Sequence, residues 1–132
     1  DDDSNFTWAD FDRLYNGELA NGLGNLVARL IGIGKKAGKF ELPEPTKNES
    51  EEEFSFKGSL ERANSLINQA DGIITTEKLW EDPSKKVEKF GEAVSRLLSA
   101  VSWLAPFMPD TAKEIHRQLT KLESKPLFPR LG

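Results

Sequence analysis

Two polar side chains in one predicted helix have the types and the spacing needed to recognise a nucleic-acid base. Asn25 and Arg29 lie four residues apart in the segment GNLVAR, and Asn21 precedes them by another four. Residues four apart share one face of a helix. Asn and Arg side chains can each hydrogen-bond a base edge through two groups at once. Hydrogen bonds to a packed neighbouring helix would suit the same positions, and the spacing alone favours this interhelical role over base recognition.

An unstacked base also needs an aromatic side chain on which to stack. Trp80 is the candidate, because its sequence EKLWED is polar and a buried tryptophan is less expected there. Trp103 and Phe107 are instead predicted to pack in the core and at a helix junction. The lysines are predicted either to form a solvated face or to contact phosphates, and they include Lys35, Lys36, Lys85, Lys86 and Lys89.

The residue inventory predicts no catalytic site, metal or cofactor within this chain. His116 is the only histidine and there are no cysteines, which excludes the usual zinc ligand sets. The chain contains neither the phosphate-binding GxxxxGK[ST] loop nor the GxGxxG dinucleotide fingerprint. The acidic run ESEEE (49–53) lacks the Asp/Gly spacing of a calcium loop and is better explained as a solvated run.

The composition predicts a folded protein without membrane contact. Hydrophobic residues make up 37% and charged residues 30% of the 132 positions, and no apolar run approaches the roughly 20 residues of a membrane helix. An acidic start, DDDSNF, and the absence of cysteine are compatible with a cytoplasmic location, which we expect. Nucleic-acid-binding domains are usually basic. Since the net charge is −4, contact with RNA requires a local patch.

Hydrophobic periodicity predicts helices throughout and favours no strand. The expected helices span about 7–36, about 59–80, from after DPS (82–84) to 104, and from about 110 to 122. Asp82 or Ser84 is the expected N-cap of the third helix, and Asp110 that of the fourth. The predicted fold class is therefore all-α, an antiparallel bundle of four to five helices.

One domain is predicted to span residues 1–132, because neither half alone would bury a sizeable core. Two prolines and a charge run mark an exposed connection at about 39–57, and an extended C-terminal tail is expected at 123–132. Glycines inside the first helix cost up to ~1 kcal/mol each relative to alanine. They predict that another backbone packs closely, and they include Gly22, Gly24 and Gly32.

Four motifs in order give the chain a specific resemblance. FTWADFDRLYNGELANGLGNLVARLIGI resembles the first helix of the anticodon-binding domain of methionyl-tRNA synthetases, including its N-L-x-x-R step. DGIITTEKLW (71–80) is similar to the family's N-x-x-I-x-x-x-x-P-W, LAPFMPDTAKEI (104–115) to its L-x-P-F-M-P-x-T-A-x-x-I, and PLFPRL (126–131) to its closing LFPR. Together the motifs cover nearly the whole chain.

The resemblance implies roles for particular residues. Asn25 and Arg29 would recognise anticodon bases, Trp80 would stack on the first of them, and Asn21 and Asp71 are possible supporting residues. Two positions depart from the family pattern: Asp71 replaces its Asn, and Leu79 replaces its Pro. The loss of that proline predicts that the chain before Trp80 is less fixed.

The resemblance also implies a place in a larger enzyme. The family's HIGH and KMSKS motifs, which belong to its Rossmann-type catalytic domain, do not occur here. This chain would then recognise the CAU anticodon of initiator or elongator methionine tRNA without aminoacylating it. A catalytic domain elsewhere in the same protein would ligate methionine to tRNA using ATP. Two alternatives remain: the anticodon domain of a related valine, leucine or isoleucine enzyme, and a helical protein-interaction module with no RNA role.

Overall fold

All secondary structure in the described part of the chain is helical. The computed structural model describes residues 18–38, 42–43 and 56–122. The helices are α2 (Glu18–Ala37), α3 (Phe56–Glu77), the 3-10 helix η3 (Pro83–Lys85), α4 (Val87–Leu104) and α5 (Pro109–Lys121). The predicted all-α bundle is confirmed. The predicted connection (39–57) falls mostly outside the described residues, although α3 already includes its last two positions, and the predicted tail (123–132) lies outside them entirely.

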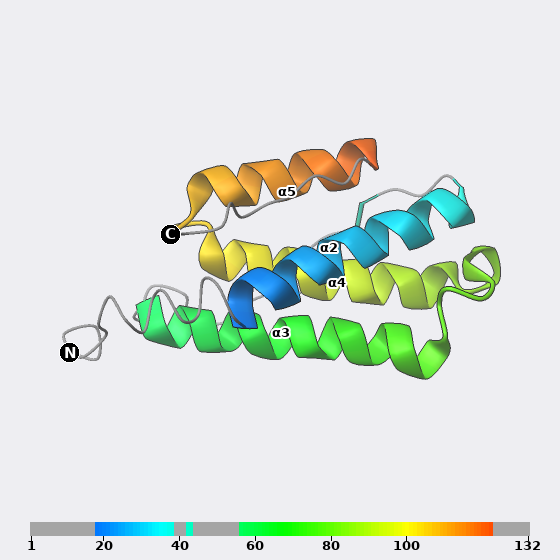
Figure 1. Cartoon of the computed structure of the whole chain (residues 1–132), viewed down its shortest axis with the longest axis horizontal. Coiled ribbons are helices and arrows are strands. Elements are labelled where there is room, and N and C mark those ends of the chain that lie inside the picture. Colours follow the sequence, from blue (N-terminus) through cyan, green and yellow to red (C-terminus); the bar gives the residue numbers. More distant parts are fainter. Residues whose placement is uncertain (1–17, 39–41, 44–55, 123–132) are drawn as a thin grey trace.

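The helices α3 and α4 lie side by side and antiparallel, and α5 returns antiparallel to α4 (Figure 1). Helix α2 lies obliquely against α3 and α4 and runs in the same direction as α3 (Figure 1). The C-terminal ends of α2 and α3 therefore lie at the same end of the bundle. No helix of the described ranges is long and apolar enough to cross a membrane.

One core joins the described helices, and its residues recur at the helical spacing read from the sequence. The largest fully buried side chains are Phe90, Leu23, Leu26, Leu30, Ile31, Ile67, Ile74, Leu79, Leu97, Ile115 and Leu119. Burying one such side chain contributes about 1.5–3 kcal/mol. Trp103 is buried in this core as predicted, with the Arg62 guanidinium 5.7 Å from its ring centroid. Phe107 lies in the turn between α4 and α5, at the predicted helix junction, and its side chain is 41% exposed.

The predicted N-caps of α4 and α5 are wrong, and the start of α3 also differs from the prediction. Helix α5 begins at Pro109 with Met108 as N-cap, so Asp110 lies in its first turn. Proline is favoured at the first helical position, where its missing N–H needs no partner. Pro83 likewise opens η3, and α4 begins only at Val87 without a side-chain cap. Helix α3 begins at Phe56 instead of residue 59.

Three glycines of α2, Gly22, Gly24 and Gly32, lack the close backbone packing that was predicted for them. A Cβ added at Gly24 or Gly32 would meet no heavy atom within 4 Å, and one at Gly22 would meet only the Ile67 side chain, at 3.6 Å. Gly32 is exposed. These glycines therefore lower helix propensity without a packing requirement within the described residues.

Candidate nucleic-acid interface

A groove between α2 and α3 contains both residue types that base recognition requires. We call it the α2–α3 groove; its volume is about 350 Å³, and its lining residues are Arg29, Gly32, Ile33, Lys36, Ile74 and Trp80. Trp80 is 45% exposed, although large hydrophobic side chains are mostly buried in this fold. The groove combines a cationic, hydrogen-bonding side chain with an accessible indole. Its volume lies in the range of small-molecule pockets, about 300–1,000 Å³.

Arg29 is partly engaged by a neighbouring helix. Its Nη1 donates a hydrogen bond of 3.2 Å to Oδ1 of Asp71 in α3, and the same atoms form an ion pair. The interhelical role that the spacing favoured is thus observed for Arg29. However, the Arg29 side chain is still 44% exposed, and a guanidinium carries five N–H donors. Asp71 can therefore orient the guanidinium while other donors face the groove.

Burial raises the pKa of Asp71 above its ordinary value of 3.8, and the positive charge of Arg29 opposes this shift without cancelling it. An acid whose pKa rises on folding binds its proton more tightly in the folded chain. The free energy of unfolding then decreases as pH rises from 3.8 through the higher folded pKa. Asparagine, the residue of the family pattern at this position, does not ionise and would avoid this loss of stability.

Asp71→Asn should therefore raise the free energy of unfolding at pH 7, and by more than it does at acidic pH. We expect a gain below about 1 kcal/mol, because the pair is more than one-third exposed and screened by solvent. The gain should shrink as the pH is lowered towards 3.8. Urea unfolding of both proteins across this range measures it. A difference that is constant with pH, or that grows on acidification, would contradict the assignment.

The turn that carries Trp80 is fixed by the end of α3. Lys78 adopts a left-handed conformation (φ 50°). Its N–H donates to the Thr75 carbonyl at 3.3 Å, and the N–H of Leu79 donates to the Ile74 carbonyl at 3.2 Å. This pair of bonds is the Schellman motif that ends many helices. Leu79 is fully buried, so the departure from proline does not leave the turn loose, contrary to expectation.

Two lysines hold the same turn from outside α3. Lys36, in the last turn of α2, donates a hydrogen bond of 2.7 Å from Nζ to the Trp80 carbonyl. Lys86, just before α4, donates from Nζ to the Glu77 carbonyl. The last carbonyls of a helix have no partner within it, and ammonium groups near this end also interact favourably with the helix dipole. Both lysines thereby hold the turn through backbone carbonyls, and neither of these hydrogen bonds involves the Trp80 indole.

The structure brings only part of the predicted set together. Arg29, Asp71 and Trp80 meet at or beside the α2–α3 groove. Asn25 and Asn21 are exposed on α2, one and two turns before Arg29, and are not among the residues that line the groove. Sequence reasoning named Lys36 only as a possible phosphate contact. Lys36 lies seven residues, or two helical turns, after Arg29, and this spacing could have indicated that the two residues share one face of the helix.

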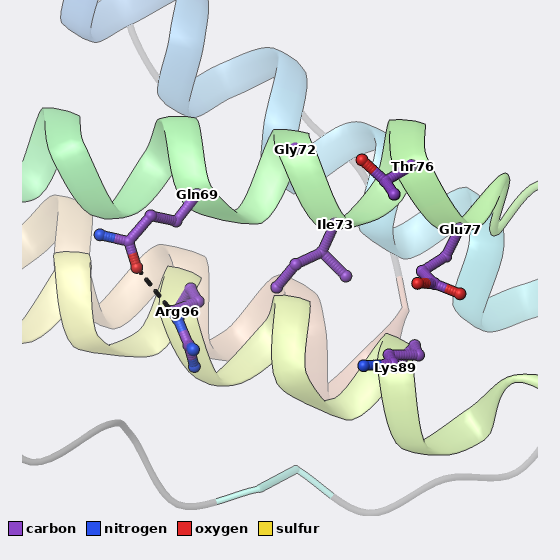
Figure 2. Close-up of a pocket in the computed structure, with 7 residues that line it drawn as sticks. All are labelled: Gln69, Gly72, Ile73, Thr76, Glu77, Lys89 and Arg96. Carbon is purple, nitrogen blue, oxygen red and sulfur yellow. Dashed lines mark hydrogen bonds between the residues drawn. The ribbon is translucent and has the colours of Figure 1, made fainter.

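A second groove lies between α3 and α4, with a volume of about 370 Å³ (Figure 2). Its lining residues are Gln69, Gly72, Ile73, Thr76, Glu77, Lys89 and Arg96. Arg96 Nε donates to Gln69 Oε1 at 3.1 Å (Figure 2), and Lys89 Nζ lies 3.5 Å from Glu92 Oε2. Among the described residues that line this α3–α4 groove there is no aromatic side chain on which a base could stack. Within the described ranges, no cluster of three or more metal-binding side chains occurs.

Comparison with known proteins confirms the resemblance read from the sequence. The chain is 31% identical over 142 residues to the methionine–tRNA ligase of Corynebacterium diphtheriae, covering 89% of this chain and 23% of that protein. It is 27% identical over 139 residues to the Saccharopolyspora erythraea ligase, with the same coverages, and 27% identical over 140 residues to that of Metallosphaera sedula, covering 89% and 25%. The chain thus corresponds to about a quarter of these relatives. No protein-family model and no solved structure matches it.

Proposed function

We propose that this chain, which resembles a region of the methionine–tRNA ligases, recognises the CAU anticodon of a methionine tRNA. The observation that carries the proposal is the α2–α3 groove, where an exposed arginine from α2 and an exposed tryptophan after α3 line one cavity. Single-stranded RNA is recognised by this combination of stacking and hydrogen bonding at base edges.

The groove supplies two different contributions to binding. The Trp80 indole would stack on an extruded base, which contributes ~1–3 kcal/mol and tolerates any base. The donors of Arg29 would select among bases, with a discrimination of ~1–3 kcal/mol. Gly32 has no side chain at the groove wall, so the RNA can approach the backbone of α2 there. Asn25, exposed one turn away, would contact a neighbouring base.

Positive charge is available locally despite the net charge of −4. Lys35 and Lys36 lie in the last turn of α2, and Lys36 contacts the Trp80 carbonyl. Phosphate contacts by such residues make binding weaker as salt increases. A helical module that binds only protein has no reason to show this dependence together with a preference for one anticodon.

The activity of the whole protein is part of the proposal. Because the chain spans about a quarter of its relatives, the ATP-dependent ligation of methionine to tRNA would be carried out by a catalytic domain elsewhere in a longer cytoplasmic protein. The present residues would bind tRNA and hold its anticodon. The relatives described above are methionine enzymes, which favours methionine over valine, leucine or isoleucine.

Trp80→Ala should weaken binding of an RNA stem-loop carrying CAU by about 5- to 150-fold, as expected from loss of one stacked base. Fluorescence anisotropy of a labelled stem-loop at low salt measures the dissociation constant. Phe107→Ala is the matched control, because Phe107 is a similarly exposed aromatic residue in the turn between α4 and α5. Equal affinities for wild type and Trp80→Ala would reject the α2–α3 groove as the binding site.

A further inference from the structure

We propose that Lys36 is the positioning residue for the Trp80 indole, so that stacking on RNA depends on a lysine that need not touch the RNA. This inference rests on the proposed function and adds a residue to it. Lys36 joins the end of α2 to the turn after α3 through its hydrogen bond of 2.7 Å to the Trp80 carbonyl. An ammonium donating to a carbonyl is a charge-assisted bond, stronger than one between neutral groups.

The bond acts on Trp80 itself, beyond the point where α3 can hold it. The Schellman bonds fix Lys78 and Leu79, and the Lys86 ammonium fixes the Glu77 carbonyl. Among the described contacts, the Lys36 bond is the one that reaches the carbonyl of Trp80 from another helix. Without it, the turn would keep its buried Leu79 but lose the hydrogen bond from α2 to the Trp80 carbonyl.

The position of Lys36 also relates the two proposed RNA-binding groups to each other. Arg29 and Lys36 lie two turns apart on α2, and both line the α2–α3 groove. A helix is rigid over two turns because its backbone hydrogen bonds are internal. The Arg29 guanidinium and the Lys36 ammonium that holds Trp80 are therefore both carried by α2. Lys36 sets the distance between them, and this distance must match the spacing between a stacked base and a hydrogen-bonded one.

Lys36→Met should weaken binding of the CAU stem-loop by at least about fivefold, the lower end of a stacking contribution. Methionine keeps a long unbranched side chain and removes the donor. Lys35→Met is the control for lost charge, since Lys35 is the exposed neighbour on the same turn. It should produce a smaller loss. Lys36→Arg keeps a donor and a positive charge and should restore most of the affinity. Thermal unfolding of each variant establishes that the bundle is intact.

A double-mutant cycle separates positioning from direct contact. If Lys36 acts through the indole, Lys36→Met should have no more effect than Lys35→Met when Trp80 is already alanine. An undiminished effect in that background means that Lys36 binds RNA directly, and it overturns the inference alone. Equal losses of affinity in Lys36→Met and Lys35→Met when Trp80 is intact would also overturn it. If Trp80→Ala itself leaves affinity unchanged, the proposed function fails together with the inference.

Discussion

Arg29→Ala should weaken binding of a CAU stem-loop by about 5- to 150-fold, the equivalent of the ~1–3 kcal/mol that a bidentate contact to a base contributes. Asp71 holds the guanidinium at the groove, and the Arg29 side chain remains 44% exposed. The ion pair therefore orients the guanidinium and leaves other N–H donors accessible to RNA. Alanine favours helix more than any other residue, and we expect thermal unfolding to change little. Anisotropy titration of the two proteins gives the affinity ratio.

Two further variants show whether geometry or charge causes this loss. Arg29→Lys keeps the charge but not the planar fork of donors, so it should recover little of the affinity. Arg96→Ala removes one positive charge from the α3–α4 groove and should have only the small effect of reduced phosphate attraction. Full recovery in Arg29→Lys, or an equal loss in Arg96→Ala, would indicate a non-specific charge contribution and contradict the assigned role.

Leu79→Pro should destabilise the fold by about 2 kcal/mol or more, through a lost hydrogen bond and lost buried volume, although proline is the residue in the pattern that this segment resembles. The Leu79 N–H donates to the Ile74 carbonyl, and its side chain is fully buried. Proline removes both the donor and part of the buried volume. It also favours extended backbone for the residue before it, whereas Lys78 is left-handed with φ of 50°. Urea unfolding measures the change.

The control for this prediction is Leu79→Met, which keeps the N–H and nearly the same volume and should cost less than about 1.5 kcal/mol. If Leu79→Pro were as stable as Leu79→Met, the Schellman ending of α3 would not be what fixes the turn.

The helices could be predicted from the sequence because their apolar residues repeat with the helical period. Leu23, Leu26 and Leu30 of α2 are all buried, as that pattern requires. The helix starts were less predictable, since polar caps and prolines compete for neighbouring positions. Pro109 begins α5, and Asp110 follows within it.

The candidate site was only partly visible in the sequence. Trp80 was identified from its polar neighbours and from the resemblance, and its exposure fits that choice. The Arg29–Asp71 pair and the Lys36–Trp80 bond join residues more than 40 positions apart. Such contacts depend on how α2 is rotated and shifted against α3, which helical periodicity does not specify. The buried role of Leu79 could not be read from its difference from proline.

The most direct test of anticodon recognition is the ratio of the affinities of the wild-type chain for two stem-loops that differ only in the first anticodon base, CAU and UAU. Anisotropy titration at one fixed low salt concentration provides both dissociation constants. We expect CAU to bind at least about fivefold more tightly, the lower end of discrimination by base-edge contacts. We also expect this preference to be lost in Trp80→Ala, which removes the surface that holds the base in place. Equal, salt-sensitive binding of both RNAs would contradict anticodon recognition and leave only a charged helical bundle.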